Sequence, residues 1–529
     1  GVSDWIAHMR SQGINTPSLT LYTGAGVQLR NYAPTLMMNI TDYEYGWRSN
    51  AAGTGTVIAT GMTLDSSQFK GVTTPSVVSG ITRGGYSVYG NTTQTNKVDI
   101  NAGSHADVRA GYTNGLNGGS EHNTLNLTGG NVTNGYAGYT TGVHLLADPT
   151  SPTNPAAVDT SKNADAKKNT VNIQGGTLNA GGKLYGGYIA TNASLTPPNN
   201  VSAGDASGNT INIESGTFGG STEIYGGYTN GTGKATGNTV NLGKSDGTFN
   251  APTLNNVFIY GGASSSSTSD VMTGNTLNVN TQNITARGVT NFGKTVFNLN
   301  STTTVSYPTA NTLLTIGGGA TSGLDWAGVE VKPGSFTFTP STYNARLFTA
   351  MHNTAGISFT KGTTNTYLPI GAKEFLKGDF EYMIDTDNHS VSAGQDVYID
   401  GHQFRNHTAT YNETPSHTEA WSGRTASGQA VKDNKLTVSG GTLTTAAYGG
   451  LVENKKHNTD GTFQIAAGKA ERNTIEVTGG SVANAYGVKV NVAGGGAEEN
   501  SVKITGGNIG GSAYGADLSV AAGMGTGAK

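Results

Sequence analysis

Short stretches in which branched apolar residues alternate with polar ones recur along most of this chain of 529 residues. The clearest is Asn-Thr-Val-Asn-Ile at 169–173, followed by Gly-Gly-Thr-Leu at 175–178 and by Leu-Tyr-Gly-Gly-Tyr at 184–188. Two further stretches share this order of residues, those that begin at Asn209 and Asn473. A unit that is too small to bury its apolar face alone, when copied in series, is typical of a solenoid.

The alternation predicts a short β-strand with one buried face. In the stretch at 169–173, Val171 and Ile173 are expected to point inward and Asn172 toward solvent, because successive side chains of a strand point to opposite faces. Each strand would then lie against its copies in the neighbouring repeats, and its apolar side chains would form a continuous core.

The residues that follow predict the remainder of one repeat. The glycines at 175–176 are expected to bend the chain, and the residues at 177–178 to begin a second strand. Leu-Tyr at 184–185 is expected to lie in a third strand, before the glycines at 186–187 turn the chain again. The fold class is therefore an all-β parallel β-helix solenoid with three strands per coil.

The asparagine that heads each repeat gives the length of a coil. The shortest spacing between successive heads is 27 residues, which at roughly 3.3 Å per residue suits three short strands and three turns. Longer spacings indicate loops inserted at one corner, as at 145–168 and 191–208, where a solenoid can carry variable recognition. The heads lie at positions 96, 123, 169, 209, 238 and 275.

The clarity of the repeat divides the chain into four regions. Residues 1–95 are expected to form an N-terminal cap or irregular β region, and residues 96–282 a stack of coils. Residues 283–433 interrupt the pattern and are interpreted as irregular coils or an inserted β subdomain, with a second domain as the alternative. Coils return at 434–529 and are expected to continue beyond this segment, because the sequence stops where the next asparagine is due.

Composition excludes several classes of function. The net charge is −3 and only 12% of residues are charged, which gives no basic surface for nucleic acid. The absence of cysteine excludes disulfides, thiolate catalysis and iron–sulfur clusters. The apolar runs are too short to span a bilayer as helices. The 80 glycines, without a Gly-X-Y period, are interpreted as turn residues.

Repeating tyrosines are the first candidates for ligand contact. They are expected to form one column along the rod, which favours packing between stacked rings but would also suit stacking of sugar rings. The residues singled out as possible ligand contacts are Tyr185, Tyr225, Tyr260 and Tyr448. The column as a whole is expected to contain the tyrosines at 112, 185, 225, 260, 448, 486 and 514.

Two other groups of polar residues could carry function. The head asparagines are interpreted as an internal ladder of amides, each bonded to the next coil. Asp385 and Asp387, close to His389, are interpreted as a solvated turn, with a calcium site or an acid–base pair as the alternative. The four histidines between 389 and 417 match no short metal-binding signature. We therefore predict no catalytic, cofactor-binding or metal-binding residue.

The repeat of Asn-Thr-Val-Asn-Ile, Gly-Gly and Tyr-Gly-Gly resembles the passenger regions of bacterial autotransporters, the type V secretion proteins, especially large adhesin-like ones. The resemblance covers 96–282 and 434–529. It implies a right-handed β-helix at the outer-membrane surface or in the extracellular space. It also implies membrane contact only through a C-terminal barrel that is missing from these residues, and attachment to host or bacterial glycans or proteins.

The sequence thus predicts an adhesin or stalk, not an enzyme, that displays contact loops on a rigid rod. A self-assembling extracellular filament or surface-layer subunit is the first alternative, and axial polymerisation would distinguish it. A β-helix polysaccharide-active enzyme is the second alternative, and a groove holding two acidic residues roughly 5 to 10 Å apart would favour it.

Overall fold

The computed structural model describes residues 18–21, 35–49, 62–88, 90–144, 159, 161–193, 195, 200–246, 254–318, 321–353, 357–360, 371–386, 396–456, 468–492 and 495–518. The chain is all-β, with 57% of residues in strands and 1% in helix, and it confirms the parallel β-helix. It divides into two compact units, here called unit 1 (1–244, 249–278 and 286–293) and unit 2 (245–248, 279–285 and 294–529).

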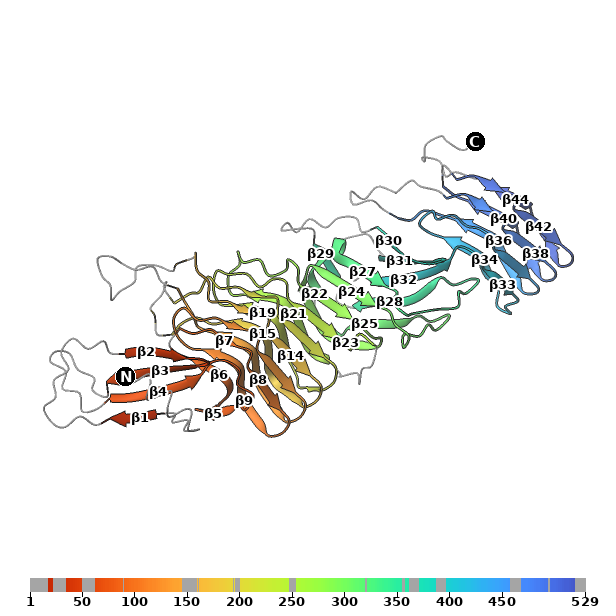
Figure 1. Ribbon diagram of the computed structural model, residues 1–529. Helices are drawn as coiled ribbons and strands as arrows, with labels where there is room; N and C mark the ends of the chain where they lie inside the picture. The colour runs from red at the N-terminus through yellow and green to blue at the C-terminus, as the bar shows by residue number, and fades with distance from the viewer. Residues whose placement is uncertain are drawn as a thin grey trace. The chain divides into compact units, whose positions relative to one another are not determined.

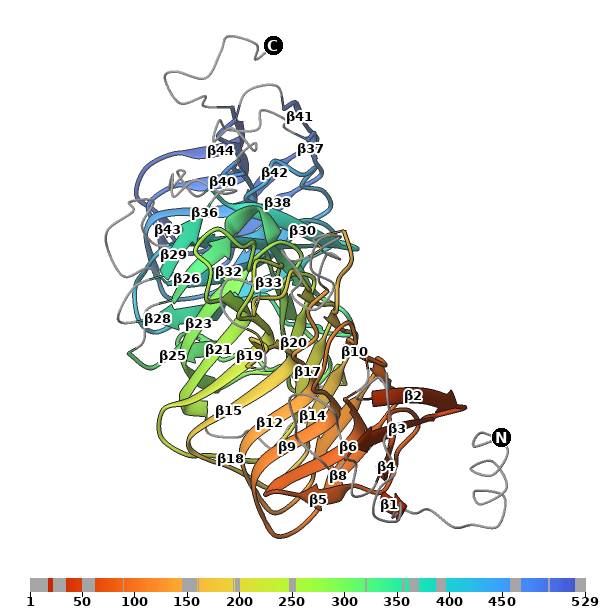
Figure 2. The same ribbon diagram turned by 90° about the vertical axis from the view of Figure 1, so that its left-hand side faces the viewer.

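Unit 1 contains three ladders of parallel strands, which Figure 1 and Figure 2 show stacked side by side. The long-strand ladder contains β6 (Ile81–Ser87), β9 (Ser104–Thr113), β12 (Asn131–Thr140), β15 (Thr177–Ile189), β19 (Thr222–Thr229) and β21 (Leu254–Ser264). The second ladder contains β8 (Lys97–Ile100), β11 (Thr124–Leu127), β14 (Thr170–Ile173), β17 (Thr210–Ile213), β20 (Thr239–Leu242) and β22 (Thr276–Val279). The third contains β7 (Thr93–Gln94), β10 (Ser120–Glu121), β13 (Ala166–Lys167) and β16 (Ala206–Ser207).

The remaining strands of unit 1 lie beside these ladders. They are β1 (Ser18–Leu21), β2 (Thr35–Ile40), β3 (Tyr43–Ser49), β4 (Met62–Gln68), β5 (Ser76–Val78), β18 (Thr217–Phe218) and, spanning the boundary of the units, β23 (Ile284–Phe292). Strands β1 to β4 form an antiparallel sheet in the order β1-β4-β3-β2.

One coil of unit 1 passes through β13, β14 and β15, so three strands per coil are confirmed. Their assignment differs from the expectation, because 177–178 and 184–185 belong to the single strand β15. The third strand is instead the two-residue β13, directly before Asn169. The bend at 175–176 is confirmed, and Gly176 adopts a φ of 71° that favours glycine.

The turn expected at Gly186 and Gly187 is wrong, because both residues lie inside β15. A Cβ at Gly186 would lie 2.4 Å from the carbonyl oxygen of Gly226 in the next coil. A Cβ at Gly187 would lie 2.6 Å from Nδ2 of Asn209. These glycines therefore leave room for the backbone and the buried asparagine of a neighbouring coil, and they do not reverse the chain.

The second ladder carries the predicted core. Val171 and Ile173 are buried, with exposed fractions of 0% and 1%, and Asn172 is partly exposed, as expected. Val171 pairs in register with Leu125 on one side and Ile211 on the other. Burying an aliphatic side chain of this size stabilises the fold by about 1.5 to 3 kcal/mol, so each coil stabilises both of its neighbours.

The head asparagines form the predicted amide ladder inside unit 1. Asn209 donates from Nδ2 to Oδ1 of Asn238 over 3.0 Å and to the carbonyl of Ala166 over 3.1 Å. Its own Oδ1 accepts from the backbone N–H and from Nδ2 of Asn169. The same bond joins successive heads at 96, 123, 169, 209, 238 and 275. Every member of the ladder is buried, so its hydrogen bonds replace those that water would supply.

Unit 2 begins with parallel strands that are less regular than those of unit 1. Strand β24 (Lys294–Asn298) pairs with β27 (Val329–Lys332), β25 (Asn311–Ile316) with β28 (Arg346–Asn353), and β26 (Thr321–Asp325) with β29 (Ile357–Thr360). A 3-10 turn, η1 (Trp326–Gly328), is the one helical element among the described residues. An antiparallel sheet follows, made of β30 (Lys373–Lys377), β31 (Phe380–Thr386) and β32 (Val397–Gln403).

Regular coils then return within unit 2. One ladder contains β33 (Thr408–Tyr411), β35 (Lys435–Val438), β38 (Thr474–Val477) and β42 (Ser501–Ile504). The long-strand ladder contains β34 (His417–Thr425), β36 (Thr442–Val452), β39 (Ser481–Val482), β40 (Ala485–Val490), β43 (Asn508–Ile509) and β44 (Ala513–Asp517). The short strands β37 (Ala470–Glu471) and β41 (Ala497–Glu498) form a third ladder. The buried Asn434 and Asn473 and the partly buried Asn500 are bonded in series, as in unit 1.

The same arrangement of an antiparallel hairpin precedes the regular coils in both units. In unit 1 the hairpin β3–β4 pairs Tyr43 with Gln68, and in unit 2 the hairpin β31–β32 pairs Phe380 with Gln403. The residue after each glutamine is a phenylalanine, whose carbonyl accepts from the first buried asparagine of the following coils, Asn96 or Asn434. We call β3–β4 and β31–β32 the cap hairpins; each meets the first coil through the same contacts.

Each cap hairpin also carries a buried glutamate. In unit 1, Glu44 accepts hydrogen bonds from the hydroxyls of Ser67 and Ser87, the backbone N–H of Val88 and the amide of Asn91, over 2.7 to 2.8 Å. Its exposed fraction is 0%. Ser87 ends the first long strand, β6, so this carboxylate binds the cap hairpin to the coils.

Glu381 has the equivalent place in unit 2, where it is also fully buried. It accepts from Nδ1 of His402 over 3.0 Å, from the hydroxyl of Thr425 over 2.6 Å and from the backbone N–H of Ala426 over 2.6 Å. The N–H and the hydroxyl of Ser427 also donate to it. Thr425 ends the long strand β34, as Ser87 ends β6, so the two carboxylates have equivalent places at the start of the two stacks of coils.

Candidate functional site

The outer face of the long-strand ladder in unit 1 carries two columns of tyrosines, which we call the tyrosine face. The inner column contains Tyr136, Tyr185, Tyr225 and Tyr260, and the outer column contains Tyr86, Tyr112, Tyr139, Tyr188 and Tyr228. Rings of the inner column are nearly parallel, with interplanar angles of 3° to 10° and centroids 4.6 to 4.9 Å apart. The columns meet edge to face, as between Tyr185 and Tyr188, with centroids 4.7 Å apart.

The strand register produces both columns. Tyr185 is paired with Tyr225, and Tyr188 with Tyr228, so equivalent positions of successive coils lie directly over one another. The single column expected from the sequence is therefore wrong for Tyr112, which is in register with Tyr139 and belongs to the outer column. Stacked and edge-to-face aromatic pairs each stabilise a fold by about 0.5 to 1.5 kcal/mol beyond their buried area.

The two middle rings of the inner column are less exposed to solvent than the rest of the tyrosine face. Tyr185 and Tyr225 have exposed fractions of only 6% and 7%, whereas Tyr260, Tyr188 and Tyr228 are partly exposed. The rings of Tyr185 and Tyr225 are covered by their neighbours, and ligand contact by Tyr185, Tyr225 or Tyr260 stays a prediction. The outer column, together with Tyr136 and Tyr260, is the part of the tyrosine face that exposes aromatic surface to solvent.

One end of the tyrosine face carries an arginine that is paired with an aspartate. The guanidinium of Arg109 lies 4.2 Å from the ring centroid of Tyr112 and 3.8 Å from that of Tyr139. It also binds Asp107 in a two-point contact of 2.9 and 2.8 Å. Burial alone would lower the pKa of Arg109, but the hydrogen bonds and charge of Asp107 outweigh burial and raise it. Arg109 is therefore a fixed cation that supports the rings by cation–π contact.

Burial keeps the phenols of Tyr139 and Tyr225 neutral at physiological pH. Burial raises the pKa of Tyr139 to about 12. Burial is also the main cause of the raised pKa of Tyr225, to which the nearby carboxylate of Glu223 adds; the two groups share a hydrogen bond of 2.8 Å. These two phenols therefore remain neutral hydroxyl groups in acidic and in mildly alkaline conditions.

Unit 2 carries a shorter aromatic column of the same kind. Tyr448 stacks on Tyr486 with centroids 5.4 Å apart, and Tyr486 on Tyr514 at 5.7 Å. Tyr448 has an exposed fraction of 3%, and its hydroxyl donates to Glu419 over 3.0 Å. Ligand contact through Tyr448 therefore stays a prediction, whereas Tyr514 is 47% exposed.

Only part of the predicted acidic turn lies within the described residues. Asp385 lies in β31 and accepts from the backbone N–H of Thr386 over 2.8 Å, whereas Asp387 and His389 lie outside the described residues. Asp396 bonds His352 over 2.8 Å, and Asp400 forms an ion pair with Arg346 at 2.7 Å. These two carboxylates, which follow the predicted turn in the sequence, therefore each have a basic partner of their own.

The three described histidines of the 389–417 stretch make separate contacts. His402 is bonded to Glu381, His407 to the carbonyl of Ser422 over 2.9 Å, and His417 stacks on Tyr343. Within the described ranges, no group of three or more His, Cys, Asp or Glu side chains is arranged to hold a metal ion. In the same ranges, no helix has the length and apolar character needed to cross a membrane.

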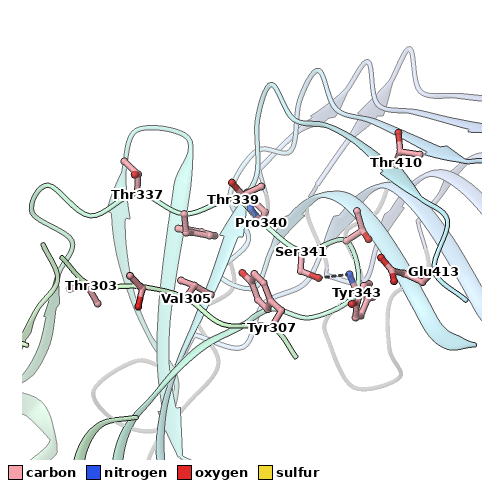
Figure 3. A pocket seen from close by; sticks show the side chains of 13 residues that line it. Thr303, Val305, Tyr307, Thr337, Thr339, Pro340, Ser341, Tyr343, Thr410 and Glu413 are labelled. Atoms are coloured by element: carbon pink, nitrogen blue, oxygen red, sulfur yellow. Dashed lines mark hydrogen bonds between the residues drawn. The ribbon is translucent and has the colours of Figure 1, made fainter. Parts of the chain in front are cut away.

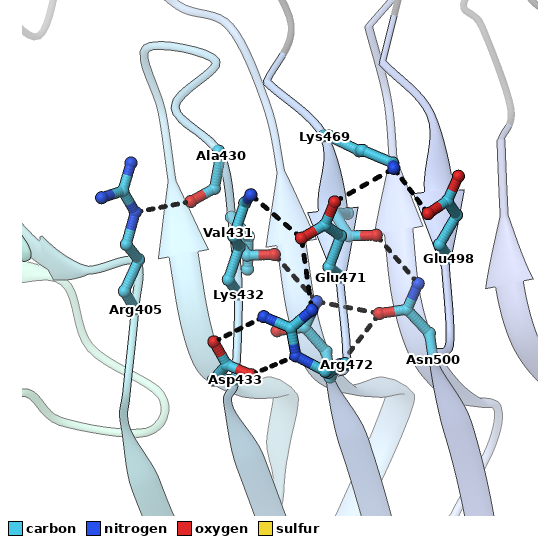
Figure 4. Close-up of polar contacts among 12 residues, drawn as sticks. Arg405, Ala430, Val431, Lys432, Asp433, Lys469, Glu471, Arg472, Glu498 and Asn500 are labelled. Carbon is cyan, nitrogen blue, oxygen red and sulfur yellow. Dashed lines mark hydrogen bonds and ion pairs between the residues drawn. The ribbon is translucent and has the colours of Figure 1, made fainter.

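A network of exposed charges joins the short strands of unit 2 (Figure 4). Glu471 contacts Lys432 at 3.0 Å and Lys469 at 3.1 Å, and Lys469 also contacts Glu498. Arg472 forms a two-point contact with Asp433 in the preceding coil. Exposed pairs of this kind contribute little stability individually, but their alternating signs favour the observed register.

We expect Glu476 to titrate well below an ordinary glutamate. Its carboxylate lies 2.7 Å from Lys435 and 2.7 Å from Lys503, in the coils on either side, and hydrogen bonds from these lysines lower its pKa to about 2. A lowered pKa means that these ion pairs are complete above about pH 4.3 and are lost as the pH falls through about 2. Carboxyl-carbon NMR titration should report this value, and Lys435→Gln with Lys503→Gln should return it toward the ordinary range. An unchanged titration in the double variant would contradict the assignment.

Comparison with family models, with curated proteins and with solved structures finds no match to this chain.

Proposed function

We propose that this chain is a β-helical stalk of a bacterial surface protein that attaches to glycans or proteins on other surfaces. The tyrosine face carries the proposal, because it is an ordered, partly exposed aromatic surface that repeats over successive coils. Identical weak contacts repeated along one rod add through multivalency. The resemblance of the repeats to autotransporter passengers, which implies an extracellular or outer-membrane surface location, agrees with this role.

The contacts that hold the tyrosine face in place suit a binding surface better than they suit a catalytic site. The inner rings, Arg109 and the amide ladder hold the outer column in fixed positions, so binding would order few side chains. Among the described residues, the charged groups near the face, such as Asp107 and Glu223, are bonded to Arg109 and Tyr225 and are not a free acid–base pair. These features support a contact surface more than the rival polysaccharide-active enzyme.

The test is adhesion of beads coated with the purified chain to bacterial and host epithelial cells. We expect Tyr188→Leu combined with Tyr228→Leu to weaken attachment roughly tenfold, because two outer rings are removed while apolar volume is kept. Tyr514→Leu, which changes an exposed tyrosine of unit 2, is the matched control and should leave attachment unchanged. Circular dichroism and thermal unfolding must show that all three proteins are folded.

The adhesion assay also separates the alternatives. Attachment that is equal in the double variant and the control would remove the tyrosine face from the proposal. If the intact chain attaches to no cell type and forms axial polymers in electron micrographs, the filament or surface-layer subunit becomes the better proposal. Release of reducing sugar from a polysaccharide panel would instead favour the enzyme.

A further inference from the structure

A cavity of about 620 Å³ lies within unit 2 (Figure 3). Its walls come from the segments 303–307 and 337–343, and from Thr410 in β33 and Glu413 just after it. A volume of this size is within the range of small-molecule sites. The figure shows the side chains of both segments, of Thr410 and of Glu413 arranged around this space.

The walls of this cavity combine hydroxyl groups with aromatic rings. Hydroxyls come from threonine and serine side chains, including Thr303, Thr339, Ser341 and Thr410. The ring of Tyr343 is held in place by stacking on His417 with centroids 3.9 Å apart. Because this ring is already fixed, a ligand that stacks on it would lose little additional side-chain entropy.

Tyr307 supplies the most specific polar group. Its hydroxyl oxygen is buried and makes no hydrogen bond of ordinary geometry. Burial raises the pKa of Tyr307 to about 12, and the nearby backbone of Ser341 offsets this only in part. A buried hydroxyl without a partner is costly in a folded protein, so this group is suited to receive a bond from a ligand or donate one to it.

The charge of the cavity restricts the ligand class. Glu413 is the one acidic or basic side chain among the residues that line it. A carboxylate accepts hydrogen bonds from two neighbouring hydroxyls and repels anionic ligands. The apolar face of a sugar ring stacks on aromatic side chains, while its hydroxyls bond to the Thr, Ser and Tyr groups.

We propose that this cavity binds a neutral oligosaccharide, with Glu413 and Tyr307 bonding sugar hydroxyls and Tyr343 stacking on a sugar ring. The proposal rests on the proposed function, for which it names a ligand class and a second contact site. It is independent of the tyrosine face, because all of the residues that line the cavity belong to unit 2.

The test is binding to immobilised oligosaccharides that end in neutral glucose, galactose or mannose, compared with sialylated oligosaccharides. The intact chain should prefer a neutral probe. Glu413→Gln should weaken binding to that probe roughly 10- to 100-fold, and Tyr307→Phe roughly two- to tenfold. Tyr307→Phe should leave the thermal unfolding midpoint nearly unchanged, because the hydroxyl that it removes makes no hydrogen bond of ordinary geometry. Glu498→Gln, at an exposed carboxylate of unit 2, is the control.

Each outcome decides the proposal. Loss of binding in both cavity variants, with an unchanged control and folded proteins, supports it. Binding that is unchanged in Glu413→Gln and Tyr307→Phe overturns it and leaves the adhesion proposal in place. A preference for sialylated probes, or no binding to any neutral probe, also overturns it, whereas attachment of coated beads to cells separately decides the proposed function.

Discussion

Asn209→Asp is expected to lower the free energy of unfolding of the coils around it by about 3 to 5 kcal/mol. Nδ2 of Asn209 donates to the carbonyl of Ala166 and to Oδ1 of Asn238, and both are buried. A carboxylate cannot donate these bonds, so it would face two oxygens across a desolvated interface. Hydrogen exchange of the amides in β14, β17 and β20 measures the loss where it occurs.

The control for this experiment is Asn212→Asp, three residues later in the same coil. Asn212 is partly exposed and belongs to an outer row of amides, where it donates to Asn172 over 2.7 Å. Water can replace that hydrogen bond, so the expected loss is below about 1 kcal/mol. Equal exchange rates in the two variants would contradict the claim that the inner ladder stabilises the stack.

The pH dependence of the first variant has a definite sign. Burial and the two facing oxygens would raise the pKa of the introduced carboxyl above the unfolded value of about 3.9. The destabilisation is therefore complete above the raised pKa and declines as the pH falls toward the unfolded value. Asn212→Asp should show a much weaker trend, because its carboxyl stays in contact with water.

Local sequence was sufficient to predict the faces of the strands and the ladder of asparagines. Alternation of Val171, Asn172 and Ile173 defines the inner and outer faces by itself, since a strand has a period of two. An asparagine at the start of each repeat also meets its own copies when coils stack in register. Both predictions depend only on periodicity, and both are confirmed.

Features that depend on contacts between coils could not be predicted from local sequence. Gly186 and Gly187 suggest a turn when taken alone. They are needed because a neighbouring coil leaves no room for a side chain; a Cβ at Gly186, for example, would lie 2.4 Å from the carbonyl oxygen of Gly226. Tyr185 and Tyr188 belong to different columns because the strand accommodates both on its outer face. The cavity around Tyr307 joins segments that are about a hundred residues apart, and no motif marks it.

The duplicated cap hairpin did leave a signal in the sequence. Glutamate followed by tyrosine occurs at 44–45 and 381–382, and Gln-Phe followed by a basic residue occurs at 68–70 and 403–405. The pattern is easily missed because it does not share the period of the coils. Its meaning depends on antiparallel pairing and on a buried carboxylate, which periodicity does not predict.

Glu381→Gln should therefore destabilise unit 2 by about 3 to 5 kcal/mol, the range for breaking a buried charged contact. The donors of His402, Thr425 and Ala426 converge on both carboxylate oxygens. A glutamine amide would replace one oxygen with an N–H₂ group that faces these donors. The variant should show faster hydrogen exchange in β31, β34 and β36, measured on the full chain.

Glu44→Gln provides the matched comparison, because it makes the same change in the other cap hairpin. It should accelerate exchange in β3, β6 and β9 of unit 1, where Ser87 and Val88 donate to Glu44. Each variant is expected to affect its own unit more than the other, because each carboxylate binds the hairpin to the first coil of one stack. If neither substitution changed exchange at the start of its own coils, the two glutamates would not be the structural equivalents that their contacts indicate.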